Sequence, residues 1–278
     1  KRSTRDRPAA RRSSGDYPLS LLAAIQCCQR FHYRTPRPAL ELGHLPVSET
    51  ARMIVQTVDG ALDAQDLGRT QMHEHLLLDI YPTRWSFEHI LDDVDVAIAE
   101  MVDFRAAGGG CLVEVTPRGA GRNPAGLRRI SRASGVHIVM GTSLLWGTPK
   151  IDTLLETHCA DALADLMVRD LLEGADDSDI RAGLIGEVGC GSTRQSAGVN
   201  QISPAEERLL RAAARAQKQT GALIYTDTFH GELALEQLEL LSEEGVDLSR
   251  VVIGHLGDKR EPDLFRQIVC RGAILGFD

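Results

Sequence analysis

The feature that most constrains this chain is a repeated change of hydrophobic period that begins near residue 53. Short apolar segments typical of buried strands alternate with amphipathic segments typical of helices. Strands that are apolar along nearly their whole length predict a parallel sheet covered by helices. The predicted strands cover residues 67–73, 111–116, 136–142, 182–188, 222–228, 251–255 and 273–277, with a further extended segment at 53–58; the predicted helices cover 87–107, 124–134, 152–173, 204–220, 232–244 and 262–270.

Seven strand-helix units of similar size favour a TIM (β/α)₈ barrel over a doubly wound sheet. No G-x-G-x-x-G motif follows the first strand, and polar residues recur at the ends of many strands. We therefore predict an α/β fold with one barrel domain at residues 48–278. The count is one strand short of eight, so we expect a barrel truncated after its seventh strand, and a natural protein that continues further.

Residues 1–47 have no sustained helical or strand period. The first 37 residues carry nine basic and two acidic side chains. We interpret this segment as a disordered or artefactual basic leader. A transit or signal segment is the alternative, because the Ser-rich and Arg-rich stretch precedes a short apolar run at residues 19–25.

Composition excludes several classes of partner. After residue 37 the chain carries 22 basic and 37 acidic side chains, and such an acidic body repels phosphate, so neither nucleic acid nor an anionic membrane is expected as a partner. No segment reaches the roughly 20 apolar residues that a membrane helix needs.

The six cysteines form no C-x-x-C motif, which favours reduced thiols and a cytoplasmic protein. A small-molecule substrate and a possible homodimer remain as the expected partners.

Residues able to bind metal stand at successive strand ends, where barrel enzymes place their chemistry. Imidazole and carboxylate side chains are hard or borderline ligands of divalent ions. In chain order they are His73, His75, Glu114, Glu187, Asp227, His255 and Asp278. Glu114 could support the metal ligands or serve only as a capping acid, and we do not count it among the predicted ligands.

His73 and His75 lie two residues apart at the end of the first predicted barrel strand. Side chains at this spacing on a strand point to the same side, so both imidazoles could bind one metal ion while Glu74 points away. A turn with two exposed histidines is the alternative.

Glu187 lies in the apolar segment 183–190 (GLIGEVGC). A carboxylate at the end of a buried strand must be paired, hydrogen-bonded or metal-bound. A bridging carboxylate could hold two divalent ions about 3.5 to 4 Å apart, and an ion pair with Arg181 is the alternative. His255 likewise ends an apolar strand, where a hydrogen-bonded core histidine is equally compatible with its position.

Seven short motifs follow one another along the predicted barrel. They are VQTV at 55–58, LGRT at 67–70, MHEH at 72–75, GGGCLVE at 108–114, GVHIV at 135–139, GLIGEVGC at 183–190 and VIGH at 252–255. Together these motifs resemble the phosphotriesterase-related family of the amidohydrolase superfamily, and the resemblance runs from about residue 53 to residue 278.

The resemblance implies a TIM barrel with a centre of two divalent metal ions, zinc or else manganese. The family's H-x-H pair matches His73 and His75, its strand-six histidine matches His255, and its bridging carboxylate matches Glu187, in the branch that uses glutamate. Asp227 stands where the family has a histidine, which makes the site harder and less zinc-selective. The family's strand-eight aspartate has no counterpart in the sequence, and Gly257 stands where an aspartate is usual.

The implied function is metal-dependent hydrolysis of an ester, lactone, amide or phosphoester bond by metal-activated hydroxide. Glu187 is the predicted catalytic residue, because it would hold the two ions together. Leu145 and Trp146 could line the substrate pocket, although a loop anchor is as compatible with each. The alternatives are a catalytically impaired barrel that serves as a scaffold or weak metal binder, and a one-metal hydrolase resembling deaminases or dihydroorotase.

Overall fold

The computed structural model describes residues 53–145, 148–189, 201–257 and 260–277. The basic leader predicted for residues 1–47 lies outside this part of the chain. Within it, we find no helix long and apolar enough to cross a bilayer.

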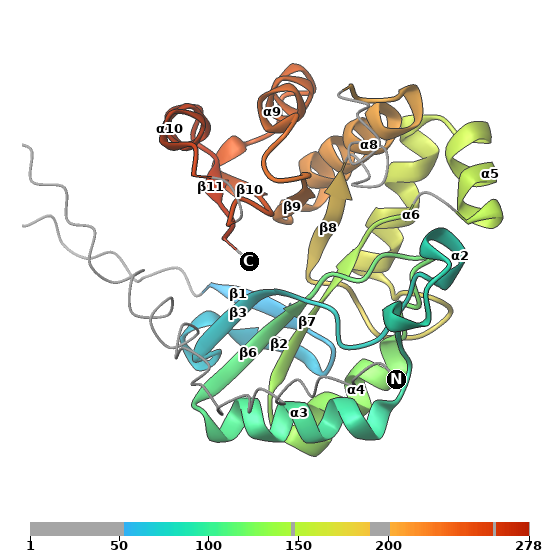
Figure 1. Cartoon of the computed structure of the whole chain (residues 1–278), viewed down its shortest axis with the longest axis vertical. Coiled ribbons are helices and arrows are strands. Elements are labelled where there is room, and N and C mark those ends of the chain that lie inside the picture. Colours follow the sequence, from blue (N-terminus) through green and yellow to red (C-terminus); the bar gives the residue numbers. More distant parts are fainter. Residues whose placement is uncertain (1–52, 146–147, 190–200, 258–259, 278) are drawn as a thin grey trace, which may run out of the picture. The chain divides into compact units, whose positions relative to one another are not determined.

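Among the described residues, the main sheet contains seven strands, all parallel to their neighbours, in the order β11-β10-β9-β8-β7-β6-β3. Strands that follow one another along the chain are neighbours in this sheet, as in a barrel, and the sheet curls into a half-barrel (Figure 1). The predicted α/β, barrel-type fold is thereby confirmed. The strands are β3 (Arg69–Glu74), β6 (Gly109–Glu114), β7 (His137–Thr142), β8 (Leu184–Gly189), β9 (Ile224–Asp227), β10 (Val251–Ile253) and β11 (Ile274–Leu275).

Helices connect these strands and lie on the outer side of the curved sheet (Figure 1). Their ends carry local signals: Ser203 and Glu206 form a capping box at the start of α8, and Gly221 ends it in the left-handed conformation. The helices are α2 (Tyr81–Arg84), α3 (Val94–Ala106), α4 (Pro124–Ser134), α5 (Pro149–Thr157), α6 (Ala160–Leu172), α8 (Pro204–Thr220), α9 (Ala234–Glu243) and α10 (Pro262–Cys270), with 3₁₀ turns η1 (Ala64–Asp66), η2 (Phe87–His89) and η3 (Leu248–Arg250).

Two predicted helices differ from the observed ones. The helix predicted at 152–173 is interrupted, because His158 and Cys159 are both extended and separate α5 from α6. The helix predicted at 87–107 begins at Val94, since the Asp93 carboxylate caps the backbone N–H groups of the first turn. The preceding residues instead form η2 and strand β5 (Ile90–Leu91), which pairs antiparallel with β4 (Leu78–Asp79).

The extended segment predicted at 53–58 lies outside the main sheet. It forms an antiparallel hairpin of β1 (Ile54–Thr57) and β2 (Gly60–Asp63). Val58, which follows β1, is buried, and its N–H donates to the carbonyl of Ile138 on β7 at 2.9 Å. The hairpin is thus attached directly to the sheet.

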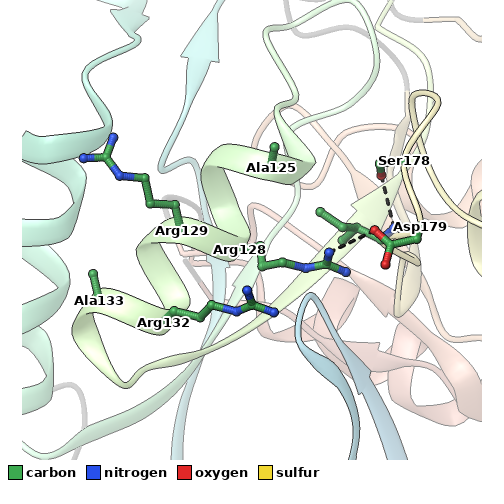
Figure 2. Close-up of a pocket in the computed structure, with 8 residues that line it drawn as sticks. Ala125, Arg128, Arg129, Arg132, Ala133, Ser178 and Asp179 are labelled. Carbon is green, nitrogen blue, oxygen red and sulfur yellow. Dashed lines mark hydrogen bonds and ion pairs between the residues drawn. The ribbon is translucent and has the colours of Figure 1, made fainter.

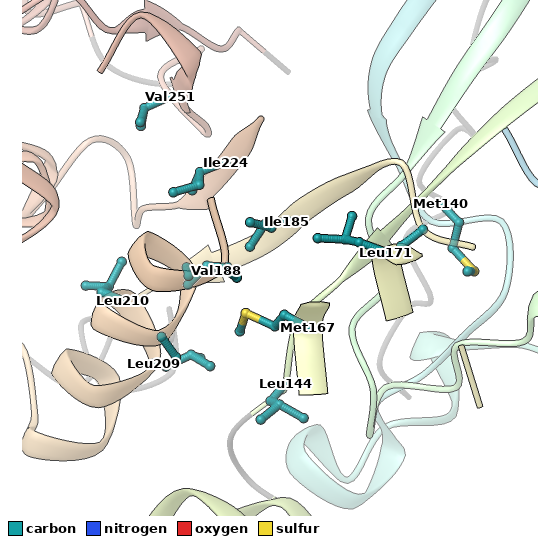
Figure 3. Close-up of a cluster of buried hydrophobic side chains, with 14 of the residues drawn as sticks. Met140, Leu144, Met167, Leu171, Ile185, Val188, Leu209, Leu210, Ile224 and Val251 are labelled. Atoms are coloured by element: carbon teal, nitrogen blue, oxygen red, sulfur yellow. The ribbon is translucent and has the colours of Figure 1, made fainter. Parts of the chain in front are cut away.

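The apolar core has two layers, because alternate strand residues face opposite sides. Cys111 and Val113 of β6, with Val115 directly after the strand, belong to the inner cluster, whereas Leu112 of β6 belongs to the outer one. In the outer cluster, side chains of α6 and α8 such as Met167 and Leu210 pack near Ile185 of β8 (Figure 3). The inner layer fills the concave side beneath the strand ends.

Candidate metal centre

His73 and His75 are placed by β3. His73 is the next-to-last residue of the strand and is buried, whereas His75 follows the strand and is half-buried. The ring of His73 packs edge-on against Tyr225 of the inner core, with centroids 5.2 Å apart. Both imidazoles lie beside Glu187, with their Nε2 atoms 3.4 and 3.8 Å from its carboxylate oxygens.

Glu187 occupies an irregular part of β8. The register between β8 and β9 shifts between Ile185 and Val188. Irregularities of this kind redirect side chains and are common beside active sites. The backbone N–H of Glu187 donates to the carbonyl of Val115 at 3.1 Å, which holds the glutamate against the end of β6.

Asp227 and His255 complete the set from the next two strands. Asp227 is the last residue of β9, and its carbonyl accepts a hydrogen bond from the Gln237 side chain of α9 at 2.7 Å. His255 follows β10 by two residues and has a φ of +58°, which is unusual for a residue other than glycine. Such conformations persist where the surrounding structure enforces them, often at functional sites.

The five side chains converge on Glu187. Its Oε2 lies 3.4 Å from His73 Nε2 and 3.5 Å from His255 Nε2. Its Oε1 lies 3.8 Å from His75 Nε2, and His255 Nε2 is 3.4 Å from Asp227 Oδ1. We call the set His73, His75, Glu187, Asp227 and His255 the ligand cluster. It contains two groups of possible metal ligands, which share Glu187: His73, His75 and Glu187, and Glu187, Asp227 and His255.

The geometry of the ligand cluster fits divalent ions. Two atoms that each bind one tetrahedral ion at about 2.1 Å are about 3.4 Å apart, close to the separations observed. Glu187 Oε2 is buried and accepts no hydrogen bond within the described part of the chain, so a cation would satisfy it. The two groups contain imidazole nitrogens and carboxylate oxygens, the donors that zinc and manganese accept.

Electrostatics keeps Glu187 in the form that binds metal. Burial raises the pKa of this carboxyl, but the neighbouring imidazole of His255, together with His75 and His73, outweighs burial and holds the pKa below its ordinary value. Glu187 is therefore an ionised carboxylate at neutral pH.

The sequence predictions for other residues have different outcomes. Leu145 is half-buried, and its N–H donates to the carbonyl of Arg118; its place in a substrate pocket stays a prediction. Trp146 and Asp278 lie outside the described residues.

The role of Glu114 stayed open between support of the ligands and a cap, and Thr116 was not predicted from the sequence. Glu114, at the end of β6, is fully buried, and Thr116 contacts both Glu114 and His75. The available signal was a threonine two residues after a glutamate that ends an apolar strand.

A separate surface hollow lies on α4 and the turn at residues 178–180, and it contains none of the ligand cluster (Figure 2). Three arginines of α4 line it, and each is paired with an aspartate. The pairs are Arg128 with Asp179, Arg129 with Asp95, and Arg132 with Asp59. With its arginines already neutralised, this hollow is a poor anion site.

Comparisons with known proteins agree with this geometry. The model of the phosphotriesterase family matches residues 53–278. A phosphotriesterase homology protein of Mycobacterium tuberculosis is 34% identical over 237 residues, which cover 81% of this chain and 70% of that protein. The N-acetyltaurine hydrolase of Dictyostelium discoideum is 33% identical over 190 residues, covering 68% of this chain and 49% of that protein.

A solved structure extends the likeness to three dimensions. The lactonase Lmo2620 of Listeria monocytogenes superposes with a TM-score of 0.72 and 29% identity, over 81% of this chain and 72% of the lactonase.

Proposed function

Because the chain belongs to the phosphotriesterase family, we propose that it is a hydrolase that uses two divalent ions bound by the ligand cluster. Enzymes of this family generally use a divalent metal. The observation that carries the proposal is the position of Glu187, which both ligand groups share. A carboxylate shared in this way is suited to bridge two ions about 3.5 to 4 Å apart.

The proposed substrate is a carboxylic ester, a lactone or an amide. Two of the similar proteins are named as a lactonase and as an N-acetyltaurine hydrolase, and both names describe attack at a carbonyl carbon. Because Glu187 resembles the bridging glutamate of one branch of the family, we place phosphotriesters behind these carbonyl substrates.

The residues of the ligand cluster differ in exposure, and we infer different roles from this difference. Divalent ions, when bound, polarise a carbonyl oxygen and lower the pKa of water. His73 is 7% exposed and fixed against Tyr225, so it serves as a rigid ligand. His255 is 36% exposed and Asp227 19%, which makes their side of the cluster the one that a substrate can approach.

The proposal is tested by removing and restoring metal in the full chain. A chelator-treated sample is supplied with zinc or manganese and assayed on a γ-lactone, an aryl ester and an N-acyl amide. We expect metal-dependent hydrolysis of at least one substrate, and a loss of about 100-fold or more in Glu187→Gln.

The matched control is Glu239→Gln, which changes an exposed glutamate on α9 and should retain full activity. A metal-loaded chain that hydrolyses none of the three substrates would favour the scaffold function instead. Equal activity in Glu187→Gln and the wild type would overturn the assignment of the site.

A further inference from the structure

A buried chain of hydrogen bonds leads from His75 away from the ligand cluster. His75 Nδ1 lies 2.9 Å from the hydroxyl oxygen of Thr116. That hydroxyl donates to Glu114 Oε1 at 2.5 Å. Glu114 is completely buried at the end of β6, so its carboxylate is reached through Thr116 and not through solvent. The proposed mechanism gives neither residue a role.

The donors around Glu114 define the direction of this chain. The backbone N–H of Thr116 donates to Oε2 at 3.2 Å, and the N–H groups of Leu76 and Leu77 also donate to the carboxylate. Backbone N–H groups cannot accept, so the carboxyl must act as the acceptor for all of them. When Glu114 is ionised, both of its carboxylate oxygens can only accept. The single proton of the Thr116 hydroxyl is then directed to Glu114, and the hydroxyl oxygen accepts from His75 Nδ1–H.

We propose that Glu114, acting through Thr116, is a positioning residue that keeps His75 in the Nδ1–H tautomer and so presents Nε2 to a divalent ion. The consequence for metal binding rests on the proposed function, whereas the tautomer itself does not. Histidine ligands of metal ions commonly donate their second N–H to a neighbouring acceptor, which fixes both the tautomer and the ring orientation. Here a threonine transmits the effect of the carboxylate over two hydrogen bonds.

Val115, which follows β6, also forms hydrogen bonds with the backbone of two segments of the ligand cluster. Between Glu114 and Thr116, the N–H of Val115 donates to the carbonyl of Glu74 at 3.1 Å, and Glu74 separates the two histidines of β3. The carbonyl of Val115 accepts the N–H of Glu187 at 3.1 Å. Residues 114–116 therefore contact both the H-x-H segment and the bridging glutamate, which places them well for a positioning role.

The tautomer is tested directly in the metal-free chain by long-range ¹H–¹⁵N correlation of the histidine side chains. Burial raises the pKa of Glu114 to about 7, so the spectra are recorded near pH 8.5, where the carboxyl is ionised. We expect His75 to carry its proton on Nδ1 in the wild type and in Thr116→Ser. Thr116→Val, which lacks the hydroxyl, should shift His75 toward the Nε2–H tautomer.

Thr226→Val is the matched control, because Thr226 is a buried threonine of β9 whose hydroxyl makes no hydrogen bond within the described residues. It should leave the signal of His75 unchanged. An Nε2–H tautomer in the wild type would overturn the proposal. So would an unchanged His75 signal in Thr116→Val.

Zinc affinity, measured by chelator competition, tests the consequence. Loss of a partner that supports a metal ligand typically weakens binding about 10- to 100-fold, and we expect this for Thr116→Val and for Glu114→Gln. Thr116→Ser and Thr226→Val should bind as the wild type does. If Thr226→Val weakened zinc binding as much as Thr116→Val does, the effect would come from core packing, and the proposal would be contradicted.

The two proposals fail in distinguishable ways. If the wild-type chain shows the Nδ1–H tautomer but binds no divalent ion, the proposed function fails while the role of Glu114 and Thr116 in fixing His75 stands. If metal binds but the tautomer does not depend on Thr116, the positioning role fails alone.

Discussion

Asp227 makes the two ligand groups chemically unequal. The group of His73, His75 and Glu187 has two imidazoles and one carboxylate, whereas Asp227 gives the other group two carboxylates and one imidazole. Nitrogen ligands favour zinc, and additional carboxylate oxygens favour harder ions such as manganese. The group that contains Asp227 should therefore bind zinc less tightly, and it is also the more exposed of the two.

This inequality predicts the effect of Asp227→Ala. The variant should retain one ion on the imidazole-rich group and lose the second, so metal content after dialysis should fall from about two to about one per chain. Elemental analysis by plasma emission measures this ratio. Asp165→Ala, at an exposed position on α6, is the control and should bind as much metal as the wild type. An unchanged ratio in Asp227→Ala would remove Asp227 from the ligand set.

Single residues of the site differ in how far sequence could predict them. His73 and His75 could be predicted from their spacing of two, and Glu187 from its place in an apolar strand. The link from His75 to Thr116 could not, because it joins residues 41 positions apart and depends on the pairing of β3 with β6. Local patterns do not contain that register.

At the scale of elements, Gly189 determines how closely β8 approaches β9. A Cβ atom at this position would lie 2.2 Å from the carbonyl oxygen of Asp227 and 2.7 Å from its Cβ. Both contacts are far shorter than van der Waals distance, and one of them is with the backbone, which cannot move aside easily. The missing side chain thus lets Glu187 and Asp227 come within reach of a common ion.

We expect Gly189→Ala to push the two strands apart. Overpacking of this kind costs about 2 kcal/mol of unfolding free energy, and zinc affinity should fall with it. Gly135→Ala offers a contrast, because Gly135 has open space around it but a φ of +71°. It should cost about 1 kcal/mol and leave metal binding unchanged. Urea unfolding and chelator competition on both variants decide the matter; equal zinc affinity in Gly189→Ala and the wild type would contradict this role.

A buried ion-pair network ties the loop after β6 to α6. Arg122 is 1% exposed and contacts Asp170 at 2.8 Å and Asp176 at 2.7 Å. Arg118 also contacts both aspartates, and the Thr142 hydroxyl donates to Asp170. Burial raises the pKa of Asp176. The hydrogen bond and the charge of Arg122, together with the charge of Arg118, lower the pKa by more than burial raises it, so it lies below its ordinary value.

The lowered pKa of Asp176 predicts a dependence of stability on pH. The unfolded chain titrates Asp176 near 3.9, so this stabilisation is present above that pH and is lost as pH falls through the lower folded pKa. Asp176→Asn should cost about 2 kcal/mol at pH 7, the contribution typical of a hydrogen bond to a charged group, and should lose less stability than the wild type on acidification. Urea unfolding between pH 7 and pH 2 measures both. Asp95→Asn, which breaks the exposed pair with Arg129, should keep the wild-type slope; a wild-type slope in Asp176→Asn would refute the assignment.

Elements with strong local signals were the most predictable. Helix 204–220 coincides with α8, because Ser203, Pro204 and Gly221 mark its ends. The break at His158 and Cys159 within the helix predicted at 152–173 could not be predicted. No glycine or proline stands at the break, and apolar residues continue on both sides of it. The short β4 and β5 pair was missed because two-residue strands have no recognisable period.

For the molecule as a whole, metal binding and folding should be coupled. The ligands come from the ends of β3, β8, β9 and β10, so the unfolded chain cannot present them together. Ions at 100 times their dissociation constant stabilise the folded chain by about 2.7 kcal/mol. For a protein of this size that corresponds to a rise in Tm of about 5 to 10 °C.

Calorimetry of the chelator-treated chain with and without zinc checks this coupling. We expect the rise in Tm for the wild type and for Glu239→Gln, and little or none for Glu187→Gln, which weakens both ligand groups at once. A rise of equal size in Glu187→Gln would locate the stabilising ions elsewhere on the molecule.

The most direct measurement is an anomalous-difference map of the chain crystallised with zinc and recorded on both sides of the zinc absorption edge. We predict two peaks about 3.5 to 4 Å apart, both within bonding distance of Glu187, with His73 and His75 near one ion and Asp227 and His255 near the other. Zinc peaks away from these side chains, or an ordered ligand cluster without any peak, would contradict this prediction.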